Sequence, residues 1–368
     1  MGVKELQNIS LGRKEDWAKV VHAEPRIQPD RLTIKQLEAL APAAKRDYDK
    51  RRRDWHANMG VLRTPQLRAI HENLSDIMDS NVQDGDRTKG AVAIEGAAGL
   101  GKSTAVEQFA KEYHLRELTD KGPMTDEGHE RWPVCRVTLS GHPTMRDLNL
   151  SLLHYFAHPG IRRGNAAEFA RRALDTFLAC EVRLLIVDDI HFLQWRASDG
   201  IKVSNHLKFI ANEFPVTLVL VGVGLSQSGL FNHGAAGRDS ILAQTARRTT
   251  RFAIERFELK DPAGQKQWKS VLRAVDQRLV LAKHHPGPLP DYLGDYLYER
   301  SSGHMGSLIT LINRASSRAI RTGVEALTKD LLEQTRIDEA AETSRPIEAA
   351  RLRADHGATK KQDDSPPF

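Results

Sequence analysis

The segment EGAAGLGKST, residues 95–104, decides the fold of this chain. It contains the pattern G-x-x-x-x-G-K-[ST], with Gly96, Gly101, Lys102 and Ser103 at the fixed positions. A short apolar run, AVAI, precedes it, and AVEQFAKEYH follows with the pattern of a helix. In this setting glycines let backbone N–H groups turn toward phosphates, and the helix N-terminus adds its positive end. The segment therefore predicts a phosphate-binding loop between a strand and a helix.

The loop predicts ATP and Mg²⁺ as the bound groups. Lys102 is expected to place its charge on the β- and γ-phosphates, and Ser103 to offer its hydroxyl to Mg²⁺. The predicted nucleotide-binding residues are Gly96, Ala97, Ala98, Gly99, Leu100, Gly101, Lys102, Ser103, Thr104 and Asp188.

A second half of the site is expected in VRLLIVDDIHFL, a near-continuous apolar run of the kind that forms a buried parallel strand. Asp188 and Asp189 end this run, so their carboxylates are expected at the carboxyl edge of the sheet, where ligands bind in open α/β folds. Asp188 would hold Mg²⁺ together with Ser103, and Asp189 would polarise the attacking water. Most ATPases of this layout carry Glu at the second acidic position, so the shorter Asp189 predicts slow hydrolysis.

Strand and helix patterns alternate around these two motifs. AVAIEG, PVCRVTLS, VRLLIVDDIHFL and PVTLVLVGVG read as strands, and helical patterns separate them. This order predicts an α/β fold with a parallel sheet sandwiched by helices. The stretch ASDGIKVSN is expected to be a loop. The predicted divisions are an N-terminal helical extension (1–85), the nucleotide-binding core (86–257), an all-helical domain of four helices (258–337) and a disordered tail (338–368).

Composition narrows the function classes. Hydrophobic residues make up 40% and charged residues 28% of the 368 residues, which suits a packed globular protein. No apolar run approaches the roughly 20 residues of a membrane span. The N-terminus lacks an apolar signal region, and the two cysteines, Cys135 and Cys180, form no disulfide or metal pattern. We therefore expect a cytoplasmic protein without a membrane partner.

The formal net charge is +6, and the cations are clustered. KRDYDKRRRDW, GIRRGNAAEFARRA and TARRTTRFAIERF each carry several Lys or Arg residues. Such clusters permit a nucleic-acid partner, and each also fits a solvated helix face.

Together, GAAGLGKST, LLIVDDIHFL, LVLVGVG, QTARRTTRF and the all-helical C-terminal domain resemble the AAA+ ATPases. Within them the chain is most similar to the transposition regulators TniB, TnsC and MuB. RRRDWHANMGVLRTPQLRAIHENL resembles the segment that precedes the first strand of TniB, and His191 after the acidic pair is typical of that group. The resemblance covers about residues 45 to 335 and implies that the helical domain is a lid.

The resemblance also implies further site residues. A trans-acting arginine would come from QTARRTTRF, with Arg247, Arg248 and Arg251 as candidates, which equally fit contacts with solvent or nucleic acid. Val223 stands nearest to where a Thr or Asn would sense the γ-phosphate, with Ser226 further along. Ser307 stands where the lid would carry an Arg, and Arg314 is the alternative. DNA contacts are expected at Arg162, Arg163 and Lys202, in segments that line the central channel of such assemblies.

The function implied is an ATP-dependent DNA-binding oligomer, a ring or a helical filament, that marks target DNA for a transposase, with a targeting adaptor as a further partner. Duplex DNA would be held mainly through its backbone, because no zinc-finger or homeodomain pattern occurs. The alternatives are a helicase loader or a signalling or defence ATPase with the same core. A small-molecule kinase fits less well, because the sequence offers no substrate lid with its own catalytic Arg or Asp.

Overall fold

The computed structural model describes residues 8–83, 89–139, 144–190, 198–226, 248–285 and 289–363, together with Leu6, Gly141 and Gly287. The chain forms two compact units. The core unit comprises Met1–Glu24 and Gln66–Glu255, and the helical unit comprises Pro25–Pro65 and Arg256–Phe368.

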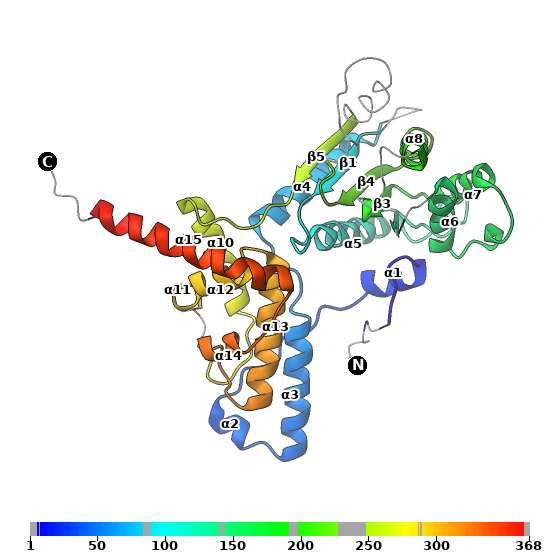
Figure 1. Ribbon diagram of the computed structural model, residues 1–368. Coiled ribbons are helices and arrows are strands. Elements are labelled where there is room, and N and C mark those ends of the chain that lie inside the picture. Colours follow the sequence, from blue (N-terminus) through cyan, green and yellow to red (C-terminus); the bar gives the residue numbers. More distant parts are fainter. Residues whose placement is uncertain are drawn as a thin grey trace. The chain divides into compact units, whose positions relative to one another are not determined.

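A five-stranded parallel sheet forms the centre of the core unit (Figure 1). The strands lie in the order β2 (Val134–Thr138), β3 (Leu184–Asp188), β4 (Thr217–Gly222), β1 (Ala91–Glu95) and β5 (Thr249–Ala253). Helices flank this sheet, which confirms the predicted α/β class. The phosphate-loop strand β1 lies between β4 and the edge strand β5, and β4 separates it from β3.

Burial explains which strands the sequence reveals. Every residue of β1, β3 and β4 is buried, and strands covered on both faces read as continuous apolar runs. β5 is an edge strand with the sequence TTRFA, and none of its residues is fully buried. Because this stretch lacks an apolar run, its sequence does not predict a strand.

Two helices of the core unit begin at capping boxes. Thr144 and Asn165 form the capping boxes that start α6 and α7. The elements are α1 (Lys14–Val21), α4 (Pro65–Ser80), α5 (Lys102–Lys121), α6 (Met145–Tyr155), the short 3-10 helix η1 (Pro159–Ile161), α7 (Ala166–Ala179) and α8 (Ser198–Glu213).

Helix α8 corrects one expectation. The stretch ASDGIKVSN was predicted as a loop, yet α8 begins at Ser198 and runs through it. A glycine near a helix start costs only about 1 kcal/mol relative to alanine. Burial of Leu207 and Ile210 further along α8 favours the helix, so Gly200 does not break it.

The N-terminal extension is divided between the two units, which differs from the single predicted extension. In the core unit, α1 buries Trp17 completely, and the Trp17 indole donates to His114 Nδ1 of α5 over 3.2 Å. Burial lowers the pKa of His114 to about 4, so the ring is neutral and able to accept this bond. Helices α2 (Ile34–Glu38) and α3 (Pro42–Ala57) belong to the helical unit.

The helical unit has its own apolar core. Trp55 of α3 packs in the same cluster as Trp268, Leu272 and Leu311 of the C-terminal helices. The four predicted helices are present, with the second divided in two. They are α10 (Pro262–Asp276), α11 (Leu289–Tyr292), α12 (Gly294–Ser301), α13 (Met305–Thr322) and α14 (Lys329–Glu333). Among the described helices of the chain, none combines the length and hydropathy that a membrane span requires.

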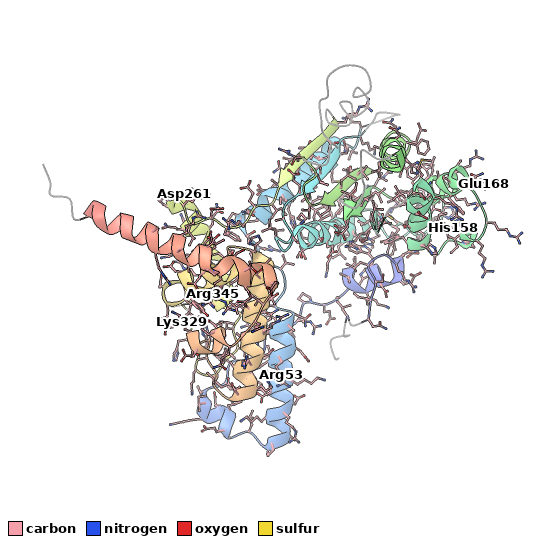
Figure 2. The ribbon with its side chains drawn as sticks, in the orientation of Figure 1. Arg53, His158, Glu168, Asp261, Lys329 and Arg345 are labelled. Carbon is pink, nitrogen blue, oxygen red and sulfur yellow. The ribbon has the colours of Figure 1, made fainter. Side chains whose placement is uncertain are left out.

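The predicted disordered tail is wrong for residues 339–363, which form helix α15 (Glu339–Asp363). Ion pairs hold this helix within the helical unit: Glu342 pairs with Arg300 at 3.0 Å, and Arg345, labelled in Figure 2, pairs with Glu299 at 2.7 Å. Within the tail the sequence predicts only a short helix at IEAARLRA (347–354), because ion pairs leave no apolar periodicity in the rest of this helix.

Candidate nucleotide-binding site

The loop between β1 and α5 has the backbone that its glycines predict. Gly99 and Gly101 adopt positive φ angles of 74° and 90°, in the left-handed region that side chains disfavour. Gly101 caps α5, which begins at Lys102. Ser103 and Thr104 follow Lys102 in the first turn of the helix, so their backbone N–H groups lie at its positive end. The Ser103 side chain is partly buried and that of Thr104 is exposed.

Gly96 is needed for a different reason. A Cβ atom at this position would lie 2.4 Å from the backbone oxygen of Ile254, which directly follows β5. The Ile254 N–H in turn donates to the Glu95 carbonyl over 2.8 Å. The backbone at Glu95 and Gly96 thus packs directly against the backbone of Ile254. This contact fixes the point at which the loop leaves the sheet.

Lys102 lies across this loop. Its Nζ donates to the Ala97 carbonyl oxygen over 2.7 Å. Burial lowers the pKa of Lys102, while the negative charges of Asp188 and Asp189 act in the opposite direction. The lysine, the loop and the acidic pair therefore occupy the same edge of the sheet, as the sequence predicts.

Asp188 and Asp189 have separate environments. Asp188 ends β3 and is 3% exposed, and its Oδ1 accepts the Asp189 N–H over 2.9 Å. Asp189 follows with φ of 56°, a left-handed conformation that aspartate tolerates better than most residues. This turn separates the two carboxylates, so Asp188 stays in the sheet edge while Asp189 belongs to the following segment.

Arg136 was not anticipated from the sequence. It lies in β2, and its Nη2 donates to Asp188 Oδ2 over 2.9 Å and pairs with Glu107 Oε1 of α5 at 2.8 Å. Burial raises the pKa of Glu107, and the Arg136 charge opposes that shift. One guanidinium thus bridges two carboxylates that would otherwise repel one another inside the protein. A single Arg within the strand pattern VCRVT was the only sequence signal for this role.

Glu95 is the second residue that sequence reasoning missed. It is 9% exposed, directly before Gly96. Its Oε2 accepts the Ser226 N–H over 2.8 Å, and its Oε1 lies 3.5 Å from Arg251 Nη1. The Glu95 carboxylate therefore joins the loop strand to the segment after β4 and to β5.

The three arginine candidates have different positions. Arg251 lies within β5, half exposed and paired with Glu95 of its own chain. Arg248 precedes β5, and its Nη1 donates to Asn212 Oδ1 of α8 over 3.1 Å. Arg247 lies outside the described residues, as does His191. Near the expected sensor position, Val223 is 37% exposed.

The candidate DNA-binding arginines lie together on one loop. Arg162 and Arg163 are exposed between η1 and α7, in the segment between His158 and Glu168, which Figure 2 labels. From α7, Arg172 Nη1 donates to the Gly160 and Arg163 carbonyls over 2.6 and 2.7 Å, which holds the loop in place. The third candidate, Lys202, lies in α8, and its side chain is outside the described part.

The oxygen donors for a metal are few. In the described part of the chain, no group of three or more His, Cys, Asp or Glu side chains could bind a metal ion by itself. Ser103 and Asp188 are hard oxygen donors, and Mg²⁺ is usually bound by one or two such protein groups together with phosphate oxygens and water. The donor set fits Mg²⁺ bound with a nucleotide.

The fold and the loop define the class. The parallel sheet in the order β2-β3-β4-β1-β5, with a glycine loop after the interior strand β1 and acids at the end of β3, matches the AAA+ fold of the ORC structures. The family model of the bacterial TniB protein matches residues 52–230. This match spans 179 of the 368 residues and, together with the fold, is consistent with a TniB-type AAA+ ATPase. Comparison with curated protein sequences gives no match.

Solved structures support the fold at low identity. The Aeropyrum pernix ORC2 protein in its ADP form is 14% identical with a TM-score of 0.55, covering 77% of this chain and 71% of that chain. The Aeropyrum pernix ORC1 protein in complex with DNA is 15% identical with a TM-score of 0.54, covering 80% and 69%. Drosophila ORC bound to DNA is 14% identical with a TM-score of 0.51, covering 87% and 72%.

Replacing Arg136 tests the buried charge network. Arg136→Met should lower the free energy of unfolding by about 3 kcal/mol, because breaking a buried ion pair leaves an uncompensated charge. Adding Glu107→Gln should recover part of that loss by removing one of the two acids. Urea unfolding measures both effects.

The matched control is Arg116→Met on the same helix as Glu107, since the Arg116 pair with Asp79 is exposed and 3.9 Å long. We expect this control to change the unfolding free energy by less than about 1 kcal/mol. An equal change in both variants would contradict the role of Arg136.

Proposed function

We propose that this chain is an ATP-dependent DNA-binding oligomer that marks target DNA for a transposase, and that it hydrolyses ATP slowly. The observation that carries the nucleotide part is the convergence of the glycine loop, Lys102 and the acidic pair at one sheet edge. The TniB match carries the link to transposition.

Each residue of the site has a proposed role. The loop N–H groups from Gly96 to Thr104 surround the phosphates, and Lys102 exchanges its Ala97 contact for the β- and γ-phosphate oxygens. Ser103 and Asp188 hold Mg²⁺, which supplies charge neutralisation when it is bound. Asp189 orients and polarises the attacking water, and its short side chain keeps hydrolysis slow.

Assembly would complete this site. An arginine from one subunit that reaches the γ-phosphate of its neighbour makes assembly depend on the triphosphate, and such an arginine is worth about 10³-fold or more in rate. Arg247, Arg248 and Arg251 are the candidates. Arg251 pairs with Glu95 and Arg248 donates to Asn212 in their own chain, so either described candidate would have to exchange that partner for the neighbouring γ-phosphate.

Duplex DNA is the proposed nucleic-acid partner. The exposed Arg162 and Arg163, on a loop fixed by Arg172, present cations suited to a phosphate backbone. Lys202 is proposed as a further contact. A transposase and a targeting adaptor are the proposed protein partners. A helicase loader or a signalling ATPase with the same core is the alternative, and a transposase gene beside this one would favour our proposal.

Two substitutions separate nucleotide binding from hydrolysis. Lys102→Ala should weaken ATP binding by roughly 100-fold, because a hydrogen bond to a charged group is worth about 3 kcal/mol. Asp189→Asn should bind ATP normally and lose about 100-fold or more in hydrolysis, since the water loses its polarising carboxylate. Calorimetric titration and phosphate release measure the two effects.

The control is Lys121→Ala at the far end of the same helix, where the lysine is half exposed. This variant should match the parent in both measurements. Normal ATP binding by Lys102→Ala would refute the loop assignment, and equal loss of binding and hydrolysis in Asp189→Asn would indicate a purely structural role for that residue.

The DNA surface is tested by salt dependence. The Arg162→Ala, Arg163→Ala double variant should reduce the log–log salt slope of duplex binding by about two, because each phosphate contact contributes about −0.9. The loss should be similar on two unrelated duplexes, measured by fluorescence anisotropy with a non-hydrolysable ATP analogue.

A Lys19→Ala, Lys121→Ala variant removes the same charge from exposed positions of the core unit and should keep the parent slope. An unchanged slope in the arginine variant would move the DNA path away from this loop. Loss on one duplex alone would indicate base readout.

A further inference from the structure

Helix α3 carries a row of cations along one side. Arg46 and Lys50 are exposed and Arg53 is partly exposed. Their spacing of four and then three residues places them on one stripe of the helix. The buried residues of α3, Tyr48, Arg52, Trp55 and His56, lie on the other side of the helix, and Figure 2 labels Arg53. We call Arg46, Lys50 and Arg53 the α3 stripe.

The acids of α3 do not neutralise this stripe. Asp47 pairs with Arg51 at 3.1 Å, and Asp49 pairs with Arg52 at 2.5 Å. Within the described residues, neither the three stripe cations nor Asp54 forms an ion pair. Like charges at these spacings destabilise a helix by roughly 0.2–0.5 kcal/mol per pair. The arrangement therefore opposes helix stability instead of supporting it.

The opposite face of α3 provides the compensation. Arg52 is 1% exposed and forks onto the Glu325 carboxylate over 2.6 and 2.9 Å. The Trp55 indole donates to the Arg278 carbonyl over 2.7 Å, and the Tyr48 hydroxyl donates to the Asp30 carbonyl over 2.7 Å. These bonds fix the rotation of α3 about its axis within the helical unit, so the stripe stays on the exposed side of the helix.

We propose that the α3 stripe is a second contact for the phosphate backbone of duplex DNA. This inference rests on the proposed DNA binding and adds to it a surface on the helical unit. Seven residues of helix span about 10 Å, so the stripe offers a row of cations of that length. Duplex DNA presents a continuous row of charges, one per about 1.7 Å of axis.

The composition of the exposed side favours DNA over a protein partner. Protein interfaces are enriched in aromatic residues, Met and Arg, with an apolar centre. The exposed residues of α3 include no large apolar side chain. They are Pro42, Ala43, Ala44, Lys45, Arg46, Asp47, Lys50, Arg51 and Ala57.

The test is the Arg46→Gln, Lys50→Gln, Arg53→Gln variant of the full chain. Glutamine is a good helix former, so α3 should remain folded, which circular dichroism and thermal unfolding check. The matched control is Lys35→Gln, Lys266→Gln, Arg321→Gln, which removes equal charge from exposed positions on α2, α10 and α13. Duplex binding is measured across a salt series with a non-hydrolysable ATP analogue.

We expect the stripe variant to reduce the log–log salt slope by about two to three, and the control to reduce it by less than about one. An unchanged slope, or equal reductions in both variants, would overturn the inference. Loss of retention on immobilised poly-glutamate with unchanged duplex binding would overturn it in favour of an acidic protein partner.

The outcomes separate this inference from the proposed function. Failure of the parent protein to bind duplex DNA would refute both. If the Arg162, Arg163 variant has a smaller salt slope and the stripe variant has the parent slope, the proposed DNA binding is supported and the α3 contact is refuted. If the stripe variant alone loses slope, the α3 contact stands.

Discussion

Buried acidic charge at the carboxyl edge of the sheet is the constraint on which the site depends. Glu95 and Asp188 are buried at this edge, Glu107 of α5 is partly buried close to Asp188, and acids in such places need a counter-charge. Arg136 serves two of them, and Arg251 serves the third. These pairs connect β2, β3, β5 and α5 through the side chains that flank the phosphate loop. The same residues that balance the charge therefore also position the loop.

The sequence was sufficient to predict those elements that depend on local motifs or on periodic apolar residues. Four of the five strands, the glycine loop and the acid-terminated β3 follow from apolar runs and from spacing. It was insufficient where side chains meet across distant segments. Arg136 and Glu95 show no distinguishing pattern, because their roles arise only when β2 is placed beside β3 and α5, and β5 beside β1. Helix α15 was missed for a related reason, since its anchors Glu342 and Arg345 are ionic and not apolar.

The division into two units changes how the N-terminal residues should be understood. Trp17 ties α1 to the core unit through a neutral histidine, whereas Arg52 ties α3 to the helical unit through Glu325. Residues close in sequence thus stabilise different units. The chain passes from the core unit to the helical unit after Glu24 and returns to the core unit after Pro65. The basic cluster KRDYDKRRR shows the consequence. Arg52 is buried in an ion pair with Glu325, whereas its neighbours Lys50 and Arg51 are exposed.

The central claim is that the nucleotide site governs assembly on DNA. The most direct measurement is the particle mass of the protein on a defined duplex, by light scattering, with ADP and with a non-hydrolysable ATP analogue. The account predicts large assemblies with the triphosphate analogue and small particles with ADP, because only the triphosphate offers a γ-phosphate to a neighbouring arginine. The same mass with both nucleotides would contradict it.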